Sequence, residues 1–166
     1  MIDPKDKLIS KITQFLNSIG IETQETKIHE ATFLPGICIK NGVLLFDSTK
    51  IYPGDLLHEA GHIALMPSKH RIKLSGDVDK IEELGNDGLE IGAICWSYAA
   101  AKYLDIDLNI LFHKDGYKGE ADWHINNFQS GNYIGLPLLQ WMEMCKGPTD
   151  TTDLKPFPHM IKWLRD

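Results

Sequence analysis

The sequence has few cysteines, and their spacing does not indicate a disulfide framework or a thiolate metal cluster. Three occur in 166 residues, Cys38, Cys95 and Cys145, and no two of them have the CxxC spacing. An odd number of widely separated thiols is typical of proteins from a reducing compartment. We therefore expect all three to be small core residues.

Long apolar runs and an excess of positive charge are also missing. The chain has no stretch of about 18 apolar residues that would predict a membrane span, and the N-terminal MIDPKDKLIS is too charged for a signal peptide. Seventeen Lys and Arg against 23 Asp and Glu give a net charge of -6, which does not favour binding to phosphate backbones or anionic lipids. We expect a cytoplasmic protein that binds neither nucleic acid nor membranes.

Low-complexity tracts, internal repeats and long linkers are likewise absent from the sequence. A content of 43% hydrophobic and 24% charged residues is typical of a globular protein. A chain of this length fits one domain that buries a full core. We therefore expect a single domain over residues 1–166.

The first part of the chain has the signals of a helix and a hairpin. Asp3 and Pro4 form a helix start, and apolar residues follow at helical spacing until Gly20. The pair Asn41-Gly42 stands between two apolar runs, which is the strongest short hairpin signal. Residues 21–28 are ambiguous between extended and irregular structure. Two strands are thus predicted before residue 48.

A helix is predicted to follow the hairpin. Asp55 is expected to cap it, so that it begins at Leu56 or Leu57. It should end near Met66, because Pro67 disfavours helical geometry at the residue before it.

This helix carries the motif HEAGH, which has the HExxH pattern. Residues four apart lie on one helix face, so His58 and His62 can each place a ring nitrogen about 2.0 to 2.1 Å from one zinc ion. Glu59 can accept a proton from a water that zinc makes acidic. The small Ala60 and Gly61 allow another backbone to approach closely. The alternative is an ordinary helix in which the two histidines pack without a metal.

A catalytic zinc site usually has a third protein ligand. A third histidine at the HxxGxxH spacing is absent, because Leu65 and Ser68 stand at the positions of its glycine and histidine. A second apolar helix is predicted from Asn86 or Asp87 to Leu104, and Glu90 lies in its first turns. A carboxylate among apolar neighbours is costly to bury unless it is paired or bound to metal, so Glu90 is the favoured third ligand. The competing residues are Glu82, Glu83 and Asp87.

The combination of a hairpin, an HExxH helix and a glutamate on the next helix resembles the gluzincin metallopeptidases. The separation of His62 from Glu90 resembles the ImmA/IrrE family of small bacterial zincin-like proteins, over approximately residues 36–104. The resemblance implies a zincin-like fold, zinc bound by His58, His62 and Glu90, and Glu59 as general base in proteolysis. Where thermolysin-like gluzincins have an acidic residue one turn after the glutamate ligand, this chain has Ile94. A carboxylate that orients a ligand histidine must therefore come from elsewhere.

Downstream, short helices are predicted near residues 108–112, at 121–129 and from Pro137. A peptidase needs a donor for the oxyanion of the tetrahedral intermediate. His124 is our first candidate for that donor, and His113 and Tyr117 are the alternatives.

The sequence as a whole predicts an α+β, zincin-like fold with a small mixed sheet packed on the helix pair that holds the metal. We expect a zinc metallopeptidase whose partner is a peptide or protein substrate. An extended substrate could add to the edge of the strand at residues 43–47. The alternative is a catalytically silent zinc-binding regulatory or binding protein with the same fold.

Overall fold

The computed structural model describes residues 1–76 and 86–166. Its elements in chain order are α1 (Pro4–Ser18), β1 (Thr23–Glu25), β2 (Ile37–Lys40), β3 (Val43–Phe46), α2 (Pro53–Leu65), α3 (Ser68–Arg71), α4 (Asn86–Tyr103), α5 (Leu108–Leu111), the 3-10 turn η3 (Tyr117–Gly119), α6 (Ala121–Gln129) and α7 (Leu136–Trp141). The fold is α+β with a small mixed sheet packed against helices, as the sequence predicted.

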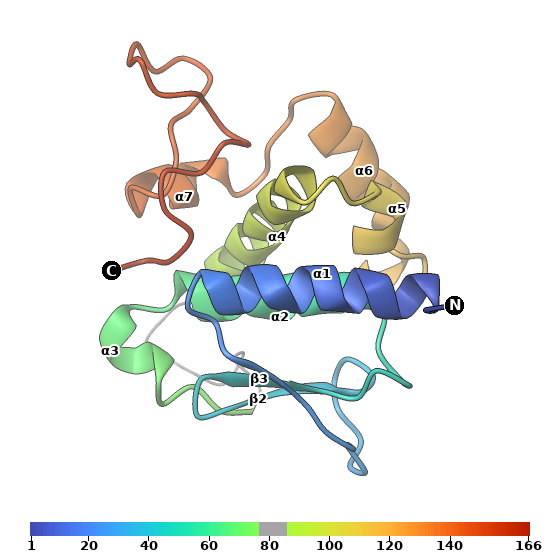
Figure 1. The fold of residues 1–166 in the computed structure, drawn as a ribbon. Helices are drawn as coiled ribbons and strands as arrows, with labels where there is room; N and C mark the ends of the chain where they lie inside the picture. Colours follow the sequence, from blue (N-terminus) through green and yellow to red (C-terminus); the bar gives the residue numbers. More distant parts are fainter. Residues whose placement is uncertain (77–85) are drawn as a thin grey trace.

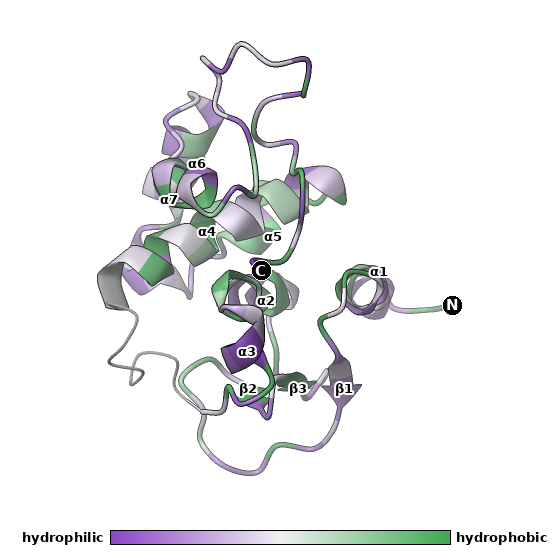
Figure 2. Cartoon of the chain, turned by 90° about the vertical axis from the view of Figure 1, so that its left-hand side faces the viewer, coloured by the Kyte–Doolittle hydropathy of each residue, from purple (hydrophilic) through white to green (hydrophobic). Residues whose placement is uncertain are grey.

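The elements form three layers with α2 in the middle one. Figures 1 and 2 show the sheet on one side, α1 and α2 side by side above it, and α4 to α7 on the other side. Apolar residues of α2 contact both outer layers, and almost the whole helix is buried. A helix covered on both faces is expected to be apolar all round, which agrees with the sequence around HEAGH.

The predicted N-terminal helix and hairpin are both present. The side chain of Asp3 accepts a hydrogen bond from the backbone N–H of Lys5 and caps α1. Strands β2 and β3 pair antiparallel across a two-residue turn. Asn41 and Gly42 both have positive φ in this turn, at 50° and 76°, a conformation that favours these two residue types.

Strand β3 lies in the centre of the sheet, so the prediction of a free edge at residues 43–47 is wrong. The strand order is β1-β3-β2, with β1 parallel to β3 in the register Thr23↔Leu44. The ambiguous residues after α1 supply this third strand. The outer strand on the hairpin side is β2, and Gly76 donates a backbone hydrogen bond to the carbonyl of Ile39 on it.

Helix α2 begins earlier than predicted, and Asp55 is not its cap. The helix starts at Pro53, because proline is well suited to the first turn, and the extended Tyr52 precedes it. Asp55 lies inside the helix with only 1% of its surface exposed. The end of the helix agrees with the prediction, since Leu65 is its last residue and Met66 is extended before Pro67.

Helices α2 and α4 pack closely at Gly61. A Cβ atom on Gly61 would lie 2.8 Å from the carbonyl oxygen of Ala93 and 3.1 Å from its Cα. A side chain there would therefore push the two helices apart. The prediction that small residues between the histidines admit another backbone is confirmed.

The downstream helices are close to their predicted positions, as α5, α6 and α7. Two of the three cysteines, Cys95 and Cys145, are buried as expected, whereas Cys38 on β2 is partly exposed. Within the two ranges that the structure describes, no helix has the length and apolar character needed to cross a membrane.

Candidate metal centre

The side chains of His58, His62 and Glu90 converge between α2 and α4. The two Nε2 atoms are 3.3 Å apart. Oε1 of Glu90 lies 3.3 Å from Nε2 of His58, and Oε2 lies 3.0 Å from Nε2 of His62. One ligand atom from each residue lies within 4.8 Å of the others, close enough for all three to bind one metal ion.

These separations are compatible with one metal ion. Donors at about 2.0 to 2.2 Å from a tetrahedral ion lie roughly 3.3 to 3.5 Å from one another. The two Nε2 atoms are at 3.3 Å, and each has a different oxygen of Glu90 near it, Oε1 at 3.3 Å and Oε2 at 3.0 Å. Two imidazole nitrogens and a carboxylate also form a common zinc donor set.

The members of this cluster differ in burial. His58 and His62 are buried, at 8% and 7% exposure, whereas 44% of the Glu90 side chain is exposed. Of the apolar neighbours of Glu90 in the sequence, Leu89 and Ala93 are buried, whereas Ile91 faces solvent at 41% exposure. Glu90 is thus partly buried and, as expected for such a carboxylate, paired. The carboxylate therefore reaches the two histidines from the exposed side of the cluster.

The contacts within the cluster shift the pKa of Glu90 and of His58. Burial raises the pKa of Glu90, but hydrogen bonds and charges from His58 and His62 outweigh it, so that the pKa lies well below its usual value. Burial lowers the pKa of His58, but the hydrogen bond and charge of Glu90, with the charges of Glu59 and Asp55, together raise it by more, so that the net shift is upward. The carboxylate is thus ionised at neutral pH, which is the state that binds a cation.

Glu59 lies between the two histidines in the chain and is partly buried. Burial raises its pKa, and the charges of His62 and His58 only partly offset this. A carboxyl group with a raised pKa is suited to accept and return a proton near neutral pH.

No family model, curated protein or solved structure matches this chain. The assignment of the site therefore depends on its own geometry and chemistry.

Asp55 and His113 form a buried pair next to the cluster. Nε2 of His113 lies 2.8 Å from Oδ1 of Asp55. Tyr52 stacks on the His113 ring at 4.0 Å, and its hydroxyl donates a hydrogen bond to Asp115. The other oxygen of Asp55, Oδ2, is buried and has no hydrogen-bond partner within the described residues. These contacts fasten the chain after α5 to the first turn of α2.

The three candidate oxyanion donors lie at different places. His113 is engaged with Asp55. The buried His124 stacks on Phe112 at 5.3 Å and is not among the residues that line the pocket at the metal cluster. Tyr117 does line that pocket, and its ring meets the His58 ring edge-on at 5.5 Å. Its hydroxyl is buried without a hydrogen-bond partner in the part of the chain that the structure describes.

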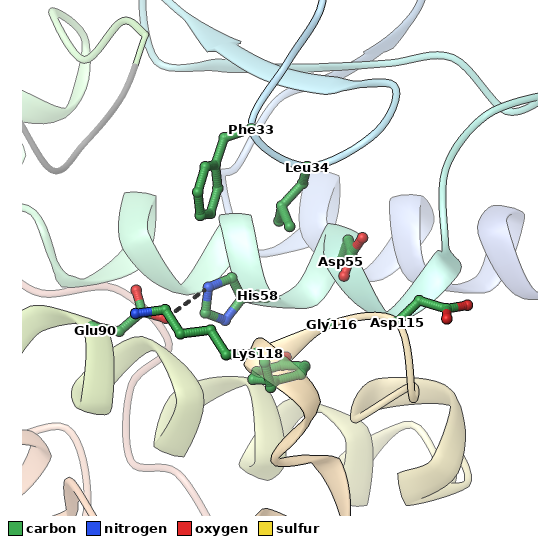
Figure 3. A pocket seen from close by; sticks show the side chains of 9 residues that line it. Phe33, Leu34, Asp55, His58, Glu90, Asp115, Gly116 and Lys118 are labelled. Carbon is green, nitrogen blue, oxygen red and sulfur yellow. Dashed lines mark ion pairs between the residues drawn. The ribbon is translucent and has the colours of Figure 1, made fainter.

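This pocket has a volume of about 230 Å³ and borders the candidate metal ligands His58 and Glu90 (Figure 3). Its other lining residues come from two loops and from the start of α2: Phe33, Leu34, Asp55, Asp115, Gly116, Tyr117 and Lys118. Of these lining residues, only Tyr117 was predicted from the sequence as a candidate for a functional role.

Two irregular segments thus provide most of the pocket wall. Tyr117 and Lys118 both have φ of 54°, followed by Gly119 at 81°. Consecutive non-glycine residues in this region are strained, and such strain concentrates at functional sites. The glycines of DGYKG were a turn signal that could have pointed to Lys118, whereas nothing in the sequence singles out Phe33.

Of the competing third ligands, Glu82 and Glu83 lie outside the described residues, as does the side chain of Asp87.

Proposed function

We propose that this protein is a zinc-dependent peptidase with a zincin-like fold, in which His58, His62 and Glu90 hold the ion. The observation that supports this most strongly is the convergence of two Nε2 atoms and a carboxylate at 3.0 to 3.3 Å from one another. The order of hairpin, HExxH helix and glutamate-bearing helix supports the zincin-like assignment.

A zinc ion, when bound, would polarise the substrate carbonyl and acidify a water molecule. Glu59 is adjacent to the ligand His58 and has a raised pKa. In the proposed reaction its carboxylate takes the proton of the attacking water and passes it to the amine that leaves. A purely structural metal site would not need this base.

Tyr117 is the oxyanion donor that the geometry favours over His124 and His113. The residue lines the pocket beside His58, and its buried hydroxyl has no hydrogen-bond partner among the described residues. Burial raises its pKa well above the usual value, so the hydroxyl remains protonated and can donate to a developing negative charge.

The test is a zinc measurement followed by a comparison of peptide hydrolysis. Purified wild-type protein is expected to hold one zinc ion and to cleave members of a peptide library. Glu59→Gln should keep the zinc and lose hydrolysis by about 10²- to 10⁴-fold, the usual contribution of a general base. Exposed Glu22→Gln is the matched control and should behave as wild type.

The outcomes separate the alternatives. Protein without zinc would exclude the metal site, and the two histidines would then only pack. Stoichiometric zinc with no cleavage that depends on Glu59 would instead support a silent zinc-binding protein.

A further inference from the structure

The pocket beside the metal cluster has one end that is rich in carboxylates. In Figure 3, Asp55 and Asp115 lie at the end away from Glu90, whereas the Lys118 side chain extends toward Glu90. The metal end of the pocket therefore has a carboxylate and an ammonium, Glu90 and Lys118, whereas the other end has two carboxylates. A ligand that enters from the metal meets Asp55 and Asp115 last.

Asp55 gives the second observation that points to a ligand. It is 99% buried and lines the pocket, and only one of its oxygens has a partner, His113. Its Oδ2 has no hydrogen-bond donor among the described residues. An unpaired buried carboxylate oxygen is costly, and a donor or positive charge brought by a ligand would offset that cost.

Asp115 provides an accessible negative charge at the same end. It is solvent-exposed, and the hydroxyl of Tyr52 donates to its Oδ2 at 2.9 Å. Tyr52 in turn stacks on His113. A Cβ atom on Gly116 would lie 2.9 Å from the His113 ring, so the chain after Asp115 also packs directly on this ring. Asp115 is thereby held next to the buried pair.

The middle of the pocket is less polar. In Figure 3, Leu34 lies on one side of the pocket and Gly116 on the other. Tyr117, next to Gly116 in the chain, also lines the pocket. Such walls suit the methylene stem of a long side chain, while a charged tip continues beyond it. The volume of about 230 Å³ is below the roughly 300 to 1,000 Å³ of pockets for drug-sized ligands, so it suits one side chain.

We propose that this pocket is a subsite for a cationic group next to the scissile bond, an ammonium or guanidinium on an aliphatic stem that Asp115 and Asp55 recognise. This inference rests on the proposed peptidase function for its position in the substrate. The cationic group is the side chain of a Lys or Arg of the substrate. The N-terminal amine of the substrate is the second source of the same chemistry.

The test compares peptides that differ only in one charge. Lysine, arginine, norleucine and glutamate are placed in turn on each side of the bond that wild-type protein cleaves, with free and acetylated N-termini. Norleucine keeps the stem of lysine without its charge. We expect lysine and arginine to raise kcat/KM about tenfold over norleucine, and Asp115→Asn to reduce that ratio toward one. Asp105→Asn, at an exposed carboxylate outside this pocket, should leave the ratio unchanged.

A binding measurement keeps the two proposals distinguishable. Zinc-loaded Glu59→Gln is titrated with the same lysine and norleucine peptides by calorimetry, which requires no hydrolysis. Tighter binding of lysine peptides without any cleavage by wild type would overturn the peptidase function and support the cationic subsite. Equal binding of lysine and norleucine, or a preference that Asp115→Asn does not alter, would overturn the subsite.

The acetylated peptides identify the source of the charge. If acetylation alone removes the preference, the recognised cation is the N-terminal amine, which supports the subsite and indicates cleavage near the N-terminus. If the preference follows lysine and arginine in acetylated peptides, the side chain is the recognised group.

Discussion

The candidate site has two halves that are built in different ways. The ligand half consists of His58, His62 and Glu90 on the long helices α2 and α4, whose backbones meet at Gly61. The pocket half consists of Phe33, Leu34 and residues 115–118, which lie in irregular chain. Metal donors must be positioned within about 0.5 Å, which regular helices achieve. Loops can change what enters the site without moving those donors.

The strongest test of the ligand half is Glu90→Gln. An amide oxygen is a neutral and weaker ligand, so we expect zinc affinity to fall by about 100-fold or more and hydrolysis to reach background. Chelator competition and zinc content measure this, with Glu22→Gln as the control. Unchanged zinc affinity would show that the third ligand lies elsewhere.

The next largest effect should come from Tyr117→Phe in the pocket half. Loss of one oxyanion donor lowers kcat by about 10²- to 10³-fold, while zinc content and Tm should stay unchanged because the hydroxyl has no partner within the described structure. Tyr103→Phe, on an exposed tyrosine away from the pocket, is the control. Equal activity of both variants would remove Tyr117 from the proposed mechanism.

Gly61→Ala tests the close packing on which the ligand half depends. A Cβ at 2.8 Å from Ala93 O should cost about 1 to 3 kcal/mol of unfolding free energy. Gly88→Ala in α4 meets no atom within 4 Å and should instead stabilise by up to about 1 kcal/mol. Urea unfolding of the zinc-free proteins compares them. If Gly61→Ala is as stable as Gly88→Ala, α2 and α4 can move apart at little cost. The ligand half would then not be held by close helix packing, in contrast to what we infer.

The smallest effect is expected for Tyr52→Phe. This change removes the hydrogen bond to Asp115 but keeps the stacking on His113, so unfolding free energy should fall by about 0.5 to 1 kcal/mol. Hydrolysis of norleucine peptides should change less than about threefold. A larger loss, measured by the same unfolding and kinetic assays, would mean that the pocket half is as rigid as the ligand half.

The parts of the fold that sequence reasoning predicted are those encoded by local signals. Asp3-Pro4, Asn41-Gly42 and Pro67 each mark a boundary within a few residues. HEAGH fixes two donors because residues four apart share a helix face. Glu90 was found as a carboxylate at the start of an apolar helix, but its half-exposed position depends on how α4 is rotated against α2, which no local pattern reports.

The features that sequence reasoning missed arise from contacts between distant residues. The sequence predicted Asp55 as a helix cap. Its partner in the structure, His113, follows 58 residues later, so no local pattern could indicate the pair. β1 has only three residues and exists through parallel pairing with β3, so periodicity could not identify it. Phe33 gains its position from the fold of a loop and has no characteristic neighbours in the sequence.

Because the candidate donors come from two helices, a bound ion would also be a cross-link. A zinc ion bound by His62 and Glu90 would close a loop between α2 and α4, in place of the ion pairs that Glu90 makes with the two histidines. Ligand binding to the native state alone stabilises it by about 4 kcal/mol when free ligand is 1,000 times the Kd. The melting temperature would then rise with the logarithm of free zinc, and the fold itself would report the zinc supply of its surroundings.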